Sequence, residues 1–205
     1  MTQIRFAMPS DAGDILKIYA PFIISTSVTF EVDVPQEYEM ERRIVSLSST
    51  YPYIVCEIDN EIAGYAFASS YHPKAAYAWN TEVTVYIKEQ YQRCNVASAL
   101  YYALFELLKK QGFFNIIALV TASNEKSENF HTSFGFQKVG VMKNVGYKLN
   151  AWHNVSIYEK FLVDEENTPT PKSIIAIGDI DSDKCDKIFQ NACKIVKMKH
   201  QPAHK

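Results

Sequence analysis

The sequence contains no run of about 18 consecutive apolar residues, the length that a membrane-spanning helix requires. Residues 1–6 lack the charged and apolar regions of a secretory signal peptide. The four cysteines, at positions 56, 94, 185 and 193, are spaced for neither a zinc site nor a C-x-x-C redox pair, and they are too few for a disulfide scaffold. We therefore expect a cytoplasmic protein with reduced thiols, no bound metal and no membrane partner.

The sequence also lacks a strong excess of either charge. The 21 Lys and Arg residues nearly balance the 23 Asp and Glu residues, which gives a formal net charge of -2. This balance argues against a protein whose main task is to neutralise nucleic-acid phosphates. Hydrophobic residues make up 47% of the chain and charged residues 21%, proportions typical of a folded globular protein and not of a disordered one.

The 205 residues predict one domain with an appendage, since a domain usually takes roughly 150 residues. We place an α/β domain at residues 1–163 and a linker with a C-terminal tail at 164–205. The linker, about 164–172, carries two prolines and two adjacent glutamates. The apolar residues beyond it are too few for an independent core, so we expect the tail to be partly disordered or to dock on the domain or a dimer partner.

Hydrophobic periodicity predicts a strand, two helices, three strands, a helix, a strand, a helix and two strands in this domain. The predicted strands are 4–6, 53–58, 62–68, 82–87, 116–120, 136–148 and 155–162. One helix is predicted to start near Ser10 or Asp11, and a second is predicted to start after Pro35, a residue suited to the first helical turn. Two more helices are predicted at 96–111 and 127–133, and a further one in the tail at 183–196. A meander followed by strand–helix units implies a mixed, mostly antiparallel sheet with helices on both faces.

The most informative segment is the strand 82–87, a short connector, and Gln92-Arg93-Cys94-Asn95-Val96-Ala97-Ser98 at the start of a long helix. Unpaired N–H groups at a helix start, together with the helix dipole, favour an anionic pyrophosphate. Arg93 can add charge-assisted hydrogen bonds. The segment therefore predicts a phosphate-binding loop.

These residues resemble the acetyl-CoA loop of the GNAT acetyltransferase superfamily, Gln/Arg-x-x-Gly-x-Gly/Ala, which is matched by Gln92-x-x-Asn95-x-Ala97. A second motif agrees in order, through Asn124, Ser127, Phe130 and Gly135-Phe136. Over about residues 4–162 the chain is most similar to phosphinothricin and methionine sulfoximine N-acetyltransferases. The segments that carry this similarity are Ser27-Val28-Thr29-Phe30, residues 51–55, Tyr77-Ala78-Trp79, residues 82–87, Phe130-His131 and residues 150–155.

The resemblance implies a GNAT-like fold, acetyl-CoA as co-substrate and a homodimer. For cofactor binding it points to Val85, Tyr86 and Ile87 in the strand, to the loop residues Arg93, Cys94, Asn95, Val96, Ala97 and Ser98, and to Asn124 and Ser127. The main departure is Asn95, which stands where the family has glycine. Asparagine tolerates a left-handed backbone better than other residues with a Cβ atom, so the loop can still form.

Two residues are candidates for the chemistry. Glu82 lies on the polar face of its strand beside the expected cofactor groove, where a carboxylate could accept the proton of an amine; the alternative is a solvent-facing strand glutamate. The resemblance places the family's proposed base here as well. His131 falls where many members have the tyrosine thought to protonate the thiolate; the alternative is a packing histidine.

The related enzymes hold a small amino acid with segments that match Phe30, Lys74, Tyr77, Trp152 and His153 in this chain. Each of these residues could equally be structural, and Asn124 could be a helix cap. The predicted function is direct transfer of an acetyl group from acetyl-CoA to the amino group of a small amino acid or analogue. Two alternatives remain: a GNAT enzyme for another amine, such as a peptide N-terminus, a polyamine or an aminoglycoside, and a non-catalytic module with a weakened cofactor loop.

Overall fold

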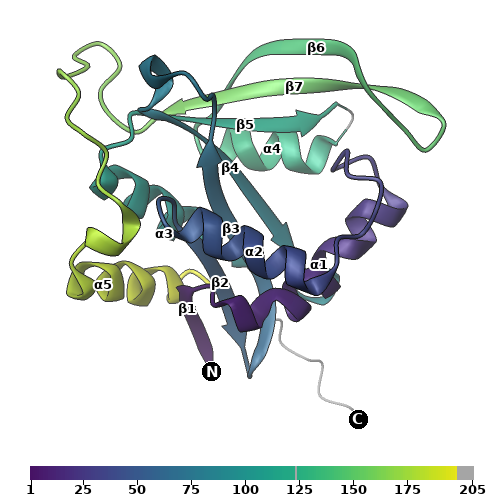
Figure 1. The fold of residues 1–205 in the computed structure, drawn as a ribbon, viewed down its shortest axis with the longest axis horizontal. Coiled ribbons are helices and arrows are strands. Elements are labelled where there is room, and N and C mark those ends of the chain that lie inside the picture. The colour runs from purple at the N-terminus through teal and green to yellow at the C-terminus, as the bar shows by residue number, and fades with distance from the viewer. Residues whose placement is uncertain (123, 198–205) are drawn as a thin grey trace.

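A mixed sheet of seven strands organises the computed structural model, which describes residues 1–122 and 124–197 (Figure 1). The strands are β1 (Thr2–Phe6), β2 (Tyr53–Ile58), β3 (Glu61–Ser70), β4 (Asn80–Ile87), β5 (Asn115–Thr121), β6 (Gln137–Lys148) and β7 (Ala151–Phe161). Their order across the sheet is β1-β2-β3-β4-β5-β7-β6, and the β4–β5 pair is parallel while the other pairs are antiparallel. The predicted mixed, mostly antiparallel sheet is confirmed.

Five α-helices of the described residues cover the two faces of this sheet. They are α1 (Ala12–Ser25), α2 (Glu37–Ser48), α3 (Val96–Gln111), α4 (Glu125–Ser133) and α5 (Ser182–Cys193). On one face, α1 and α2 bury Ile15 and Ile44 against Tyr53 and Tyr65 of the sheet. On the other face, the fully buried apolar stripe of α3, which includes Leu100 and Leu104, packs on the sheet together with residues of α5. The prediction of helices on both faces is thus confirmed.

Local sequence explains most of the boundaries. The turn between β2 and β3 uses Asp59 and Asn60 at φ 50° and 65°, as a tight hairpin requires. A similar turn at Leu149 and Asn150, φ 52° and 59°, lets β7 begin at Ala151, four residues earlier than predicted. Helix α2 starts after Pro35 as predicted, but Pro35 does not stand in its first turn, because Gln36 is the N-cap and Pro35 precedes it.

Residues 164–197 continue from β7 across the domain. The indole Nε1 of Trp79 donates to the carbonyl oxygen of Lys172 at 2.7 Å. The buried Gln111, at the end of α3, exchanges hydrogen bonds with the backbone of Ile175 at 2.8 and 2.9 Å. Helix α5 then packs beside α3 and β1 (Figure 1). None of the helices in the described ranges is long and apolar enough to cross a membrane.

Candidate active site

Strands β4 and β5 separate in the middle of the sheet. Their parallel ladder runs from Asn80–Asn115 to Glu82–Ile117 and stops there, although β4 continues to Ile87 and β5 to Thr121. The edge of β4 at Val85, Tyr86 and Ile87, the strand residues predicted to contact the cofactor, is therefore open toward β5. A cavity of about 420 Å³ lies at this opening, lined by residues of α1, α2, β4, α3, α4 and the β6–β7 hairpin.

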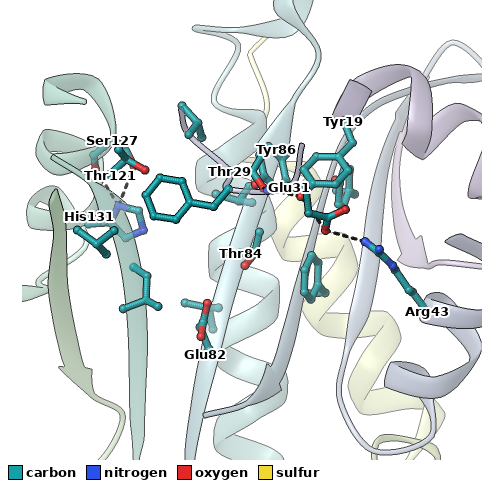
Figure 2. A pocket seen from close by; sticks show the side chains of 18 of the residues that line it. Tyr19, Thr29, Glu31, Arg43, Glu82, Thr84, Tyr86, Thr121, Ser127 and His131 are labelled. Carbon is teal, nitrogen blue, oxygen red and sulfur yellow. Dashed lines mark hydrogen bonds and ion pairs between the residues drawn. The ribbon is translucent and has the colours of Figure 1, made fainter. Parts of the chain in front are cut away.

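Glu82 stands at the point where the two strands part. Glu82, Thr84 and Tyr86 line the cavity from β4, and Figure 2 shows the first two between α4 on one side and Arg43 on the other. Burial raises the pKa of the Glu82 carboxyl, and no charged or hydrogen-bonding partner of this carboxyl is found in residues 1–122 and 124–197. A carboxylate that is poorly solvated and unpaired is a strong proton acceptor for its type.

His131 is a buried residue of α4 whose two ring nitrogens are both engaged. Nδ1 lies 2.7 Å from the carbonyl oxygen of Ser127, which can only accept, so Nδ1 carries the proton. In the neutral ring Nε2 is then the acceptor, and it receives the hydroxyl of Tyr101 at 3.0 Å. Burial lowers the pKa of His131, which keeps the ring neutral near pH 7.

Tyr101 is a buried residue of α3 that also lines the cavity. Burial is the main cause that raises the pKa of its phenol, and the negative charge of Glu82 raises it further. The two groups therefore sense each other across the cavity. His131 and Tyr101 therefore line the cavity together as a hydrogen-bonded pair.

The opposite wall is a polar network from α1, the α1–α2 loop and α2. The hydroxyl of Tyr19 lies 2.7 Å from Oγ1 of Thr29 and donates to Glu31 Oε1 at 3.1 Å. Arg43 donates to the same Glu31 oxygen at 2.8 Å and to Glu39 at 2.7 Å. Tyr19, Glu31 and Arg43 all line the cavity, and Figure 2 shows them on the side away from His131.

The loop before α3 has the geometry of an anion-binding site. Arg93 and Asn95 adopt left-handed backbone conformations, φ 67° and 57°, and Asn95 is the N-cap of α3. The N–H groups of Asn95, Val96, Ala97 and Ser98 have no acceptor among the described residues. Open N–H groups at a helix start fit a pyrophosphate. Asn95 thus takes the conformation for which the family uses glycine.

Of the remaining predicted site residues, some line the cavity and others do not. Asn124 caps α4, because its Oδ1 accepts from the N–H of Ser127 at 3.3 Å, and Ser127 lines the cavity. Phe30 lines the cavity as well. Lys74 and Tyr77 lie on the exposed connector between β3 and β4, and Trp152 and His153 lie on β7; none of these four is among the described residues that line the cavity.

Sequence patterns missed Tyr101, Tyr19, Glu31 and Arg43. Tyr101 lies in the apolar stripe of α3, a pattern that predicts a core residue. Its exposure to the cavity depends on the separation of β4 and β5, which the sequence does not show. The other three come from segments far from β4 in the sequence. An aromatic residue with a hydroxyl in an otherwise aliphatic buried stripe was the one pattern that could have indicated Tyr101.

The splayed sheet, the open N–H groups and the partly buried glutamate together define an acyl-transfer fold for a CoA thioester. Residues 4–157 match the family model for the acetyltransferase (GNAT) domain, so the chain belongs to that family. It is 32% identical to a phosphinothricin N-acetyltransferase of Streptomyces viridochromogenes over 77% of this chain and 86% of that protein. It is 25% identical to an L-methionine sulfoximine/L-methionine sulfone acetyltransferase of Pseudomonas aeruginosa, over 81% and 98% of the two chains.

Solved structures agree with this family membership. A GNAT superfamily phosphinothricin acetyltransferase from Sinorhizobium meliloti, in complex with acetyl-CoA, superposes with a TM-score of 0.79 at 26% identity, over 84% of this chain and 95% of that one. The protein is therefore a GNAT-type N-acetyltransferase, and its co-substrate is acetyl-CoA. The predictions of family, fold, enzyme class and co-substrate are confirmed.

Proposed function

We propose that this enzyme transfers the acetyl group directly to the amino group of a small amino acid or analogue. The observation that carries the proposal is the unpaired, partly buried Glu82 in a cavity of about 420 Å³ at the splay of β4 and β5. A cavity of this size suits a small acceptor. Support also comes from the relatives named for phosphinothricin and for methionine sulfoximine and sulfone, which are amino-acid analogues.

Glu82 is the proposed general base. An amino acid presents an ammonium group at neutral pH, and its nitrogen becomes nucleophilic only after it loses a proton. The Glu82 carboxylate has no competing partner in the described part of the chain, and its raised pKa strengthens it as an acceptor for that proton.

The proposed acetyl-CoA site combines the open edge of β4 with the first turn of α3. The N–H groups from Asn95 to Ser98, with the exposed guanidinium of Arg93, would hold the pyrophosphate. Ser127, in the first turn of α4, lines the cavity, and Asn124 caps that helix. The co-substrate supplies the acetyl group as an activated thioester.

The Tyr101–His131 pair is proposed to control the position of a proton on the wall of the cavity that faces Arg43 (Figure 2). While His131 is neutral, the phenol proton of Tyr101 is directed at Nε2. A proton on Nε2 would reverse this bond, so that the phenol oxygen accepts from the ring and its own hydrogen is free to point into the cavity. The pair can thereby present a hydrogen-bond donor at the site where negative charge develops on the leaving sulfur.

The wall opposite His131 is proposed to orient the acceptor. Nη1 and Nη2 of Arg43 each bond one carboxylate, which fixes the guanidinium plane while further N–H groups remain. Such a group can bind an anionic part of an amino acid, and we propose it in addition to Lys74 and His153. Phe30 supplies an apolar surface in the same cavity.

Direct transfer is favoured over a covalent cysteine intermediate. The thiol of Cys94 is buried, lies 3.9 Å from the carbonyl oxygen of Gln92, and does not belong to the described lining of the cavity. Acetyl transfer through this thiol would require the loop before α3 to open. A ternary complex needs no such rearrangement.

We propose a homodimer in which the β6–β7 hairpin takes part. This long hairpin projects from the domain (Figure 1) and exposes apolar side chains, among them Val145, Tyr147, Leu149 and Trp152, the last 62% exposed. An apolar patch of this kind marks an interaction surface. A cytoplasmic location is also proposed, and the four free cysteines suit a reducing compartment.

The test is release of free CoA from acetyl-CoA with a panel of acceptors: phosphinothricin, methionine sulfoximine, methionine sulfone, common amino acids and two polyamines. We expect saturable release with a small amino acid or one of the analogues and none with the polyamines. Saturable release only with polyamines would refute the proposed acceptor class and keep the acetyltransferase. Static light scattering of the same preparation measures the dimer, and a monomer at micromolar concentration would refute it.

A further inference from the structure

The segment after the acetyltransferase domain contacts the loop before α3, which forms part of the proposed acetyl-CoA site. The family model ends at residue 157, whereas the described chain continues to Lys197. Residues 164–197, here called the C-terminal strap, run along the domain to the start of α3. At its end, the backbone N–H of Lys197 donates to the carbonyl oxygen of Cys94 at 2.9 Å.

Burial of apolar side chains fixes the strap on the domain. Helix α5 buries Cys185, Ile188, Phe189 and Ala192 in the same core cluster as α3. The ring of Phe189 meets that of Phe6 in β1 edge to face at 5.0 Å. Because α5 is held along its length, the residues that follow it reach the loop from a fixed position.

Cys94, the residue that the strap holds, lies between two residues with unfavourable backbone conformations. Arg93 and Asn95, on either side of Cys94, have φ 67° and 57°, and both carry a Cβ atom that disfavours this region. The N–H of Cys94 donates to the carbonyl of Tyr91 at 3.3 Å, and its own carbonyl accepts from Lys197. Cys94 is buried, its N–H is held within the loop's own turn, and its carbonyl is held from outside the loop by the strap.

We propose that the C-terminal strap is a positioning element for acetyl-CoA. By holding the Cys94 carbonyl, the strap keeps Arg93 and Asn95 left-handed and keeps the open N–H groups of the first turn of α3 aimed at the phosphates. It thereby takes over the part that glycine plays in the family's loop, where no Cβ atom opposes the left-handed backbone. This inference rests on the proposed acetyl-CoA site.

The test compares two substitutions at one position of the full-length protein. Lys197→Pro removes the N–H donor, and Lys197→Ala removes the charge but keeps that donor, so the difference between the two reports the hydrogen bond. We expect Lys197→Pro to raise the dissociation constant and KM for acetyl-CoA about 3- to 10-fold with little change in kcat, and Lys197→Ala to stay within about 2-fold of the parent. Equal values for the two variants would overturn the proposal.

A third variant tests the connection to Asn95. Glycine adopts φ near 57° without strain, so in the Asn95→Gly background Lys197→Pro should raise the dissociation constant less than it does alone. Thermal melting is used to check that each variant is folded. The same loss in both backgrounds would contradict a role in supporting a non-glycine loop.

Hydrogen exchange of the parent protein gives an independent answer that needs no substitution. If the strap positions the loop, binding must in turn stabilise the strap, and acetyl-CoA should slow exchange at the Lys197 amide and in α5. Unchanged exchange there, in a sample that binds acetyl-CoA by calorimetry, would refute the inference. No calorimetric binding at all would instead refute the proposed acetyl-CoA site.

Discussion

The hydroxyl of Tyr101 lies 3.0 Å from Nε2 of His131, and this contact joins α3 to α4 in the wall of the cavity. It gives a buried tyrosine an acceptor for its proton, while the Ser127 carbonyl at Nδ1 fixes the tautomer of the buried histidine. Both groups would otherwise be unsatisfied in an apolar region, which is costly. The pair therefore contributes to stability as well as to the proposed chemistry.

Tyr101→Phe should separate these two contributions. Loss of the hydroxyl leaves Nε2 without its donor and removes the proposed hydrogen-bond donor to the cavity. We expect kcat to fall about 10- to 100-fold, the dissociation constant for acetyl-CoA to stay unchanged, and the free energy of unfolding to fall by about 1–3 kcal/mol. Steady-state kinetics, calorimetry and urea unfolding measure the three quantities. Tyr102→Phe, the next residue of α3, is the control; if both variants lose the same activity, the pair has no special role.

Glu82→Gln should remove the proposed base while preserving the shape of the side chain. We expect kcat to fall about 10²- to 10⁴-fold with an unchanged KM for acetyl-CoA. In the parent enzyme the rate should rise with pH as Glu82 loses its proton, and since burial raises its pKa, this rise lies above the ordinary range of a glutamate. The variant should lack that rise. Normal turnover in Glu82→Gln at neutral pH would remove Glu82 from the role.

The sequence predicted the sheet and most helices correctly because their burial is periodic. The alternation of Val83 and Val85 with Glu82 and Thr84 predicted the two faces of β4. In the structure the valines pack in the core cluster that contains α3, and all four residues contribute to the lining of the cavity. Helix α3 begins at Val96 as predicted, and Asn95 adopts the left-handed backbone that asparagine tolerates better than other residues with a Cβ atom.

The sequence did not predict the wall of the cavity that Arg43 and Glu31 form. Arg43 and Glu31 face β4 only because α2 and the α1–α2 loop fold over the sheet, and this arrangement depends on tertiary packing of Met40 and Ile44 with Tyr53. The hydrogen bond from Lys197 to Cys94 spans about half of the chain and has no local pattern at all. Residues that meet only through tertiary contacts leave no periodic trace in a single sequence.

The protonation of His131 should make stability depend on pH. Burial lowers its pKa in the folded protein, so the unfolded chain takes up a proton first as the pH falls through about 6.5. The stability gained by keeping the ring neutral is therefore fully present above that pH and is lost toward the lower, folded pKa. Melting temperatures from pH 7.5 to 5 should fall more steeply for the parent than for His131→Gln, which cannot titrate. Parallel curves would show that His131 does not contribute.

Arg43→Met tests the proposed acceptor wall. The substitution removes the guanidinium but keeps a long apolar side chain against the cavity. We expect the KM for the amino-acid acceptor to rise about 10-fold or more, consistent with loss of a charge-assisted hydrogen bond, while the KM for acetyl-CoA stays constant. The control is Glu39→Gln, which loses the other ion pair of Arg43 but does not line the cavity. An unchanged acceptor KM in Arg43→Met would exclude the guanidinium from acceptor binding.

Gly146 in β6 leaves the space that the ring of Phe30 occupies, and a Cβ atom at this position would overlap the ring. In Gly146→Ala the ring must therefore move, and because Phe30 lines the cavity, the acceptor site must change shape with it. We expect a several-fold higher acceptor KM and a loss of about 1–3 kcal/mol in the free energy of unfolding. Gly140→Ala in the same strand is the matched control, since its Cβ would meet Ile157 at an ordinary 3.9 Å. Equal effects of the two substitutions would mean that the loss comes from the strand and that Phe30 has no part in acceptor binding.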